Sequence, residues 1–156
     1  MRNVEDEKTF LSMEDIIMEL ENSEYKERYK IYDTYLRQDD DRWRRGYKSK
    51  FQQSLVDDNL RFFAYIKFYT EGGKKYALVA GKSGSYTVNK SSGCDLGFYL
   101  CPQKGPAKIW IDNNKKQWCQ TEFLVIATKS EEKEKSCKEA KEIEEYLVHT
   151  FGLYES

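Results

Sequence analysis

The chain has 156 residues, which is a common size for one domain and too few for two well-packed ones. With 39% hydrophobic, 15% aromatic and 34% charged residues, it can bury a core beneath a heavily charged surface, so a disordered chain is excluded. No run approaches the roughly 20 apolar residues of a membrane span, and the start, MRNVEDEKTF, lacks the apolar run of a signal peptide; we therefore expect no membrane partner and a cytoplasmic location.

Charge is unevenly distributed along the chain, although the formal net charge is only −1. Residues 1–60 contain 11 Lys and Arg against 15 Asp and Glu, residues 61–129 contain 11 against 4, and residues 130–156 contain 4 against 8, which gives −4, +7 and −4. The basic middle block is a modest footprint for a polyanion such as nucleic acid, because lysines that meet phosphates release condensed counterions. The alternative is that these lysines are spread around the domain and serve solubility.

Residues 1–60 are predicted to form an N-terminal helical extension. Ser12, followed by Glu14 and Asp15, is typical of a helix start, and apolar residues then recur at helical spacing, so residues 12–36 predict one or two amphipathic helices. A stripe of tyrosines in this segment is interpreted as packing rather than base stacking, because its neighbours are acidic. The stripe consists of Tyr25, Tyr29, Tyr32 and Tyr35.

The segment DDDRWRRGYKSK, residues 39–50, places arginines around a tryptophan. Trp43, Arg44 and Arg45 can stack on a base or grip a nucleic-acid backbone. The same residues also fit a loop or helix start that Trp43 anchors to the body of the protein. Residues 51–60 predict another short helix, and the whole extension offers a surface for substrate or for a protein partner.

From residue 61 the pattern changes to strands. FFAYIKFY and KYALVAG are rich in β-branched and aromatic residues and are joined by TEGGK, which predicts a β-hairpin. A short helix through AKIWIDNN is predicted after Gly105-Pro106. The next predicted strand, WCQTEFLVIAT, is apolar on both faces, as a central strand would be. A final helix is predicted from Ser130 to His149. Residues 61–156 therefore predict an α+β domain in which helices flank a small central mixed sheet of about three strands.

Cysteine and histidine do not indicate a metal or redox centre. The gaps between the four cysteines match none of the short zinc or redox spacings, so we expect reduced and partly buried thiols. His149 lies near the end of the final predicted helix, where a capping or surface position is expected. The cysteines are Cys94, Cys101, Cys119 and Cys137.

The sequence Gly81-Lys82-Ser83 follows the second predicted strand and raises the question of phosphate binding. A nucleotide-binding P-loop requires a glycine five positions before Gly81, where this chain has Tyr76, so ATP or GTP binding is not expected. What remains is a site for a single phosphodiester at the end of the strand. Its candidate residues are Lys82, Ser83 and, in the loop that follows, Lys90.

The final predicted helix places one glutamate among its apolar residues. At about 100° per residue, Glu144 falls within the stripe of Ile143 and Leu147, whereas the other glutamates near it point to solvent. A carboxylate directed into a core is costly unless it is paired, hydrogen-bonded or bound to a cation. Glu144 is therefore the best candidate metal ligand, and a salt bridge to a lysine is the alternative.

The order hairpin, Gly-Lys-Ser, helix, strand and helix with an inward glutamate resembles the GIY-YIG nuclease superfamily, in particular members with strands like ALVAGKS and tails like EAKEIEEYLVHTFGL. The resemblance covers roughly residues 62–156. It implies a domain that hydrolyses nucleic-acid phosphodiesters with the help of one divalent cation, Mg²⁺ or Mn²⁺. Glu144 matches the glutamate that binds this cation.

Other positions of the resemblance are substituted. Placing Val79-Ala80-Gly81 on the Tyr-Ile-Gly element puts Ile66-Lys67-Phe68 on Gly-Ile-Tyr, so that Phe68 and Val79 stand where the family has tyrosines. Strand alternation places neighbouring hydroxyls on the opposite face unless a bulge redirects one. These candidate catalytic hydroxyls belong to Tyr65, Tyr69 and Tyr76, and the phosphate-contacting arginine corresponds to Lys108.

Two functions follow from these residues. The first is a divergent metal-dependent endonuclease, acting on nucleic acid with DNA as the expected form. The alternative is a nuclease-fold protein that no longer cuts and instead binds nucleic acid or a protein that it regulates or inhibits. The inward Glu144 favours the enzyme, and the missing pair of tyrosines favours the alternative.

Overall fold

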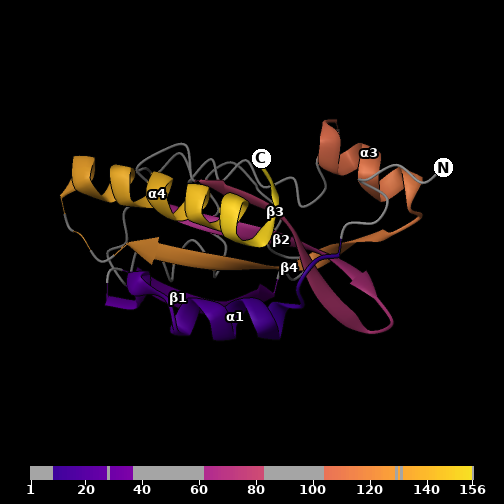
Figure 1. Cartoon of the computed structure of the whole chain (residues 1–156), viewed down its shortest axis with the longest axis horizontal. Helices are drawn as coiled ribbons and strands as arrows, with labels where there is room; N and C mark the ends of the chain where they lie inside the picture. Colours follow the sequence, from indigo (N-terminus) through magenta and orange to yellow (C-terminus); the bar gives the residue numbers. More distant parts are fainter. Residues whose placement is uncertain are drawn as a thin grey trace, which may run out of the picture.

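The computed structural model describes residues 9–27, 29–36, 62–82, 104–128, 130 and 132–155. The predicted helix at residues 51–60 and the boundary between residues 60 and 61 lie outside these ranges. Within them, helices pack against one β-sheet (Figure 1), so the predicted α+β class is confirmed. None of the helices in these ranges has the length and the apolar character needed to cross a membrane.

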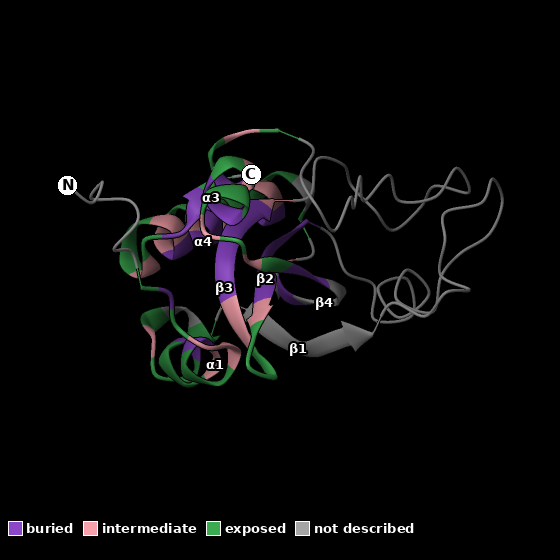
Figure 2. Ribbon diagram, turned by 90° about the vertical axis from the view of Figure 1, so that its right-hand side faces the viewer, coloured by how far each residue is buried: buried purple, intermediate pink, exposed green. Residues whose placement is uncertain are grey.

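The predicted hairpin is confirmed at the centre of the sheet. Strands β2 (Phe63–Glu71) and β3 (Lys74–Lys82) pair antiparallel and are joined by Gly72 and Gly73. Both glycines have positive φ, +58° and +79°, which a tight two-residue hairpin turn requires and glycine adopts without strain. Figure 2 shows that the two strands are buried along most of their length and exposed at the tip of the hairpin.

Among the described residues, the sheet has five strands in the order β1-β4-β2-β3-β5, where about three were predicted. Strand β4 (Gln117–Thr128) lies between β1 (Tyr29–Leu36) and β2, which confirms its predicted interior position. Strand β5 (Tyr154–Glu155) runs parallel to β3 and the other pairs are antiparallel, so the sheet is mixed as predicted. The additional strands β1 and β5 are the two ends of this order within the described ranges.

The N-terminal segment corrects the prediction of helices over residues 12–36. Helix α1 (Met13–Glu21) forms as expected, with Ser12 Oγ accepting a hydrogen bond from the backbone N–H of Asp15 at 3.3 Å. A short 3₁₀ turn, η2 (Glu24–Glu27), follows, but residues 29–36 then form strand β1 and not a helix. Pairing with β4 outweighs the helical spacing, because aromatic and β-branched residues favour strands once a neighbouring strand is present.

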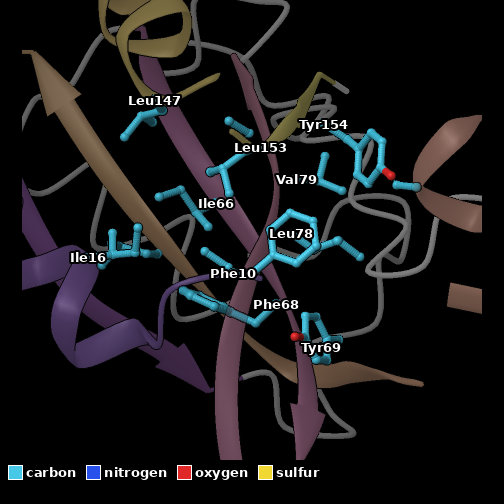
Figure 3. Close-up of a cluster of buried hydrophobic side chains, with 14 of the residues drawn as sticks. Phe10, Ile16, Ile66, Phe68, Tyr69, Leu78, Val79, Leu147, Leu153 and Tyr154 are labelled. Atoms are coloured by element: carbon cyan, nitrogen blue, oxygen red, sulfur yellow. The ribbon is translucent and has the colours of Figure 1, made fainter. Parts of the chain in front are cut away.

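One face of the sheet is aliphatic. Ala64 pairs with Ile126 and Ile66 pairs with Leu124, so these four side chains lie side by side, and we call them the aliphatic face. Helix α4 (Lys133–Phe151), the predicted final helix, contacts β2, β3 and β4. Figure 3 shows its Leu147 close to Ile66. The fully buried residues of its inner stripe are Ala140, Ile143 and Leu147.

Ser136 fixes the start of α4 to the aliphatic face. Its Oγ accepts a hydrogen bond from the backbone N–H of Phe62 at 3.0 Å and lies 2.6 Å from Oγ1 of Thr128. Thr128 has the same strand phase as Ile126, so α4 lies on the aliphatic side of the sheet. All three polar partners are buried, and this network therefore satisfies groups that would otherwise be costly to bury.

The opposite face of the sheet carries aromatic and polar side chains. On β2, Tyr65 and Lys67 alternate with Ala64 and Ile66 and therefore point away from the aliphatic face. Across β3, Tyr65 pairs with Gly81 and Lys67 pairs with Val79, which in turn pairs with Tyr154 of β5. We call this side the aromatic face; its members are Tyr65, Lys67, Tyr69, Val79, Gly81 and Tyr154.

Helix α3 (Pro106–Asn113) packs on part of the aromatic face. It begins at the predicted Gly105-Pro106 step, with the proline in the first helical turn. The Trp110 ring lies 5.3 Å from the Tyr69 ring and 5.0 Å from the Phe10 ring, between centroids. The two faces of the sheet are therefore covered by different helices, α4 on one and α3 on the other.

Candidate functional site

Glu144 points inward from α4, as the helical spacing predicts. Its side chain is only 8% exposed, and it lies on the same side of the helix as the buried Ile143 and Leu147. Its Oε1 accepts a hydrogen bond from Nζ of Lys141 at 2.8 Å. The predicted burial of this carboxylate is confirmed, and so is the alternative partner, a lysine one helical turn earlier.

Lys141 joins Glu144 to the last strand. Its Nζ lies 2.8 Å from Glu144 and 3.5 Å from Oε1 of Glu155 on β5, and its own side chain is 47% exposed. The hydrogen bond and charge of Glu144, with a smaller contribution from Glu155, raise the pKa of Lys141 above its usual value. The ammonium therefore stays charged between two carboxylates, one buried and one exposed.

The group formed by Glu144, Lys141 and Glu155 lies beside the edge of β3, because Glu155 belongs to β5, which pairs with β3. Strand β5 pairs with Val79 and Ala80 only. Within the described part of the chain, no strand pairs with Gly81 and Lys82 on that side of β3. We call Gly81 and Lys82 the end of the β3 edge; it is the Gly-Lys part of the predicted phosphodiester site.

Lys82 turns toward the beginning of α4. Its Nζ donates to Sγ of Cys137 at 3.3 Å and lies 5.2 Å from the centroid of the Phe62 ring. Cys137 precedes Glu144 by about two helical turns, or roughly 10 Å along the axis. Lys82 of β3 thus contacts the same side of α4 that carries Glu144, but Lys82 and Glu144 are not in contact.

Tyr65 approaches the same edge from the aromatic face. A Cβ at Gly81 would overlap the hydroxyl end of the Tyr65 ring, so this ring lies directly over Gly81. The φ of Gly81 is not in the left-handed region, and the glycine is needed for close approach alone. Because β3 has no side chain at this position, the phenol of Tyr65 reaches across the strand toward its edge.

Lys67 is a buried cation that the sequence analysis did not select. It is 6% exposed, and its Nζ lies 5.4 Å from the centroid of the Tyr65 ring, within the range of a cation–π interaction. Lysine is rarely this buried without a specific partner or function. The signal in the sequence was a single charge within the apolar run FFAYIKFY.

The register of the hairpin does not pair Phe68 with Val79, the two positions that were aligned with the family's tyrosines. Val79 pairs with Lys67, whereas Phe68 pairs with Ala77 beyond an irregularity in the ladder. Phe68 and Lys67 are consecutive and point to opposite faces. Lys67 therefore shares a face with Val79. Tyr65 lies on this face too, whereas strand alternation in the sequence had placed it on the face opposite to Val79.

Tyr154 is the second residue that the sequence analysis missed. It pairs with Val79 and shares its face, as Figure 3 shows, and its ring lies 6.1 Å from that of Phe10. A tyrosine therefore stands directly beside the position where the predicted family has one. No pattern could reveal it, since β5 has only two residues.

Tyr69 and Tyr76 belong to the aromatic packing near the hairpin tip. Their rings are stacked 5.3 Å apart at an interplanar angle of 21°, and Tyr69 also packs against Trp110. Burial raises the pKa of Tyr69 to about 12, and the charges of Glu71 and Tyr76 add to this effect. Both tyrosines lie toward the opposite end of the hairpin from Gly81.

Lys108 is separate from the acidic group. It lies on α3, and its Nζ binds both carboxylate oxygens of Asp112 at 2.8 Å in an exposed pair. No hydrogen bond or ion pair joins it to Glu144, both residues being described. Figure 1 shows α3 standing beyond the C-terminal end of α4.

Several predicted residues cannot be placed in this site. The candidates Ser83, Lys90, Arg44 and Arg45 lie outside the described residues, as do Trp43, Cys94 and Cys101. The two cysteines that are described, Cys119 and Cys137, are free thiols as predicted. His149 is exposed near the end of α4, also as predicted.

The carboxylate oxygens of Glu144 and Glu155 are the type of ligand atom that a hard divalent cation prefers. The buried carboxylate of Glu144 already holds a cation at 2.8 Å, and a second carboxylate, Glu155, reaches the same ammonium. Mg²⁺ is commonly bound through one or two carboxylates and keeps several waters. Among the residues of the described ranges, no group of three or more His, Cys, Asp or Glu side chains forms a ready-made metal site.

Comparison of the chain with protein-family models, with curated proteins and with solved structures found no match.

Proposed function

We propose that this chain is a metal-dependent endonuclease of the GIY-YIG type that hydrolyses nucleic-acid phosphodiesters, with DNA as its substrate. The observation that carries the proposal is the buried carboxylate of Glu144, which is 8% exposed on a helix whose other glutamates, where described, are more exposed. Burying a carboxylate is costly, and a cation-binding role accounts for that cost. The sheet, the hairpin and α4 hold Glu144 beside strands β3 and β5.

The proposed site lies at the end of the β3 edge, with one contribution from each face of the sheet. Glu144 belongs to the helix on the aliphatic face, and Tyr65 reaches over Gly81 from the aromatic face. The Tyr65 phenol would hydrogen-bond the attacking water or a phosphate oxygen, while Lys67 and Lys82 lower the cost of bringing a phosphate to the site. A bound Mg²⁺ or Mn²⁺ would supply charge neutralisation of the phosphate and of the leaving oxygen.

Plasmid nicking in the presence of Mg²⁺ or Mn²⁺ tests the proposal. Glu144→Ala is expected to lower the rate by about a hundredfold or more, the scale of losing a central electrostatic group. Glu145→Ala removes the same charge from an exposed position on the same helix and is expected to leave the rate unchanged. Equal cleavage by Glu144→Ala and by the unmodified protein would refute the proposal, provided that both show the same circular dichroism.

Comparing Tyr65→Phe with Tyr69→Phe tests whether the hydroxyl at the β3 edge, and not the hydroxyl of Tyr69 near the hairpin tip, takes part in cleavage. Tyr65→Phe keeps the ring over Gly81 and removes only the hydroxyl, so we expect cleavage to fall by about tenfold to a hundredfold. Tyr69→Phe is the matched control and is expected to retain activity. A larger loss of cleavage in Tyr69→Phe than in Tyr65→Phe would indicate that the site lies near the tip of the hairpin.

A second candidate function is a nuclease-fold protein that binds nucleic acid or a regulated protein without cutting. The pairing of Glu144 with Lys141 favours it, because the chain itself neutralises the carboxylate. The absence of tyrosines from the two aligned positions, Phe68 and Val79, also favours it. In that case DNA binding should be salt-sensitive without cleavage, and Lys82→Ala with Lys108→Ala should reduce the salt slope by about two.

If neither cutting nor DNA binding is seen, a protein partner is the remaining form of the second candidate. The N-terminal segment is the proposed docking surface, and its described part includes the exposed Met18 of α1. A Met18→Lys variant, with the exposed Glu19→Lys as a control for charge, would test this surface in a pull-down.

A further inference from the structure

The ammonium of Lys141 occupies the space between two carboxylates at the proposed site. It lies 2.8 Å from Glu144 and 3.5 Å from Glu155. The two acids carry two negative charges and Lys141 compensates one of them. A divalent cation in the same place would compensate both, so the electrostatics of the group favour exchange of the lysine for such a cation.

The exposure of the three side chains shows which of them can move. Glu144 is 8% exposed and held against the sheet, whereas Lys141 is 47% and Glu155 is 61% exposed. A half-exposed lysine on a flexible four-carbon stem can rotate into water at small cost.

We propose that Lys141 is a built-in counter-cation of Glu144, which neutralises the buried carboxylate in the metal-free protein and swings away when a divalent cation binds. This inference rests on the proposed function, since it assumes that Glu144 binds the cation. It adds that metal affinity is limited by competition from the chain's own lysine. The ordinary alternative is a helix-stabilising pair that has no connection with metal binding.

Mn²⁺ binding, measured by electron paramagnetic resonance of the free ion, tests this inference without any reference to cleavage. Lys141→Gln is expected to bind Mn²⁺ about fivefold more tightly than the unmodified protein, the upper range for losing a partly exposed ion pair. Lys138→Gln removes the same charge from an exposed position one turn earlier on α4 and is the matched control. Its affinity is expected to stay within about twofold of the unmodified protein, because charges in water interact weakly.

The outcomes separate the inference from the proposed function. If Glu144→Gln abolishes Mn²⁺ binding but Lys141→Gln binds no more tightly than Lys138→Gln, the role of Lys141 is overturned and Glu144 remains the metal ligand. If Glu144→Gln binds Mn²⁺ as well as the unmodified protein, the metal role of Glu144 fails. Absence of binding in all of these proteins overturns both.

A second measurement uses the unmodified protein, so it does not depend on how the variants fold. Titration with diamagnetic Mg²⁺ is expected to move the NMR signals of the Lys141 side-chain ε-methylene toward the values of a solvated lysine. The signals of Lys138 serve as the internal reference and should not move. Unchanged Lys141 signals at saturating Mg²⁺ would overturn the inference.

Discussion

The two faces of the sheet differ in the kind of side chain that they bury. The aliphatic face consists of Ala64, Ile66, Leu124 and Ile126 and is covered by the apolar stripe of α4, so its atoms need nothing beyond close packing. The aromatic face buries a lysine and tyrosine hydroxyls beside a glycine that has no side chain. Close packing accounts for the first face, whereas the second face also buries polar atoms.

This difference shows where function is best sought. An aliphatic core tolerates exchange between apolar residues of similar volume and encodes little beyond stability. Polar groups in a buried face cost free energy unless they are satisfied, and they persist where they have a task. On the α4 side, Ser136 and Thr128 satisfy each other in a buried network, whereas Glu144 is a buried charge that lies toward the same edge of the sheet as β5.

The largest expected loss of stability comes from a substitution in the packing against the aliphatic face. Leu147→Ala removes a fully buried side chain of α4 and should lower the free energy of unfolding by about 3 kcal/mol, through lost burial and a residual cavity. Urea unfolding followed by circular dichroism measures it. Mn²⁺ affinity per folded molecule should stay unchanged, and a specific loss of metal binding would show that the two faces are not separable as described.

A smaller effect is expected where the aromatic face requires a glycine. Gly81→Ala introduces a Cβ that overlaps the Tyr65 ring and should cost about 1–3 kcal/mol of stability, because the buried ring must move. In a Tyr65→Ala background the same change should cost less than about 0.5 kcal/mol. Additive costs in this double-mutant cycle would mean that Tyr65 does not lie over Gly81.

The smallest effect concerns the pH dependence of the aromatic face. The pKa of Tyr69 is raised from 10.0 to about 12, so the folded state keeps a proton that the unfolded state releases. The stabilisation is complete below pH 10 and is lost as the pH rises to about 12, with a slope of up to about 1.4 kcal/mol per pH unit.

The difference between the unmodified protein and Tyr69→Phe isolates this contribution from those of all other groups. Unfolding free energies in urea at pH 9, 10 and 11 provide the measurement. The two proteins should differ less at the higher pH, and Tyr146→Phe on α4 serves as the control variant. A difference that is independent of pH would contradict the burial of the Tyr69 hydroxyl.

Local patterns were sufficient for the hairpin and for the final helix. Gly72 and Gly73 were identified as a turn because only glycine adopts two successive positive φ angles easily. The burial of Glu144 followed from helical periodicity, which depends only on the geometry of one helix. In both cases the interacting residues are close in sequence, so the chain itself carries the information.

Edge strands and register were beyond these patterns. Residues 29–36 carry a helical spacing of tyrosines, yet they form a strand because β4 supplies hydrogen-bond partners from nearly a hundred residues away. The pairing of Val79 with Lys67 rather than Phe68 depends on an irregularity in the hairpin that no residue type announces. Lys67 and Tyr154 were missed as site residues for this reason.

By itself, the sequence determined the class of the fold, the order of its central elements and the inward direction of Glu144, since these depend on short-range geometry and on the burial of apolar side chains. Only the tertiary structure decided which side chains share a face and which second carboxylate Lys141 meets. Those contacts join Lys141 to Glu155, and Tyr65 to Gly81, across separate elements. Their partners are chosen by how the sheet assembles, a property of the whole chain and not of any one segment.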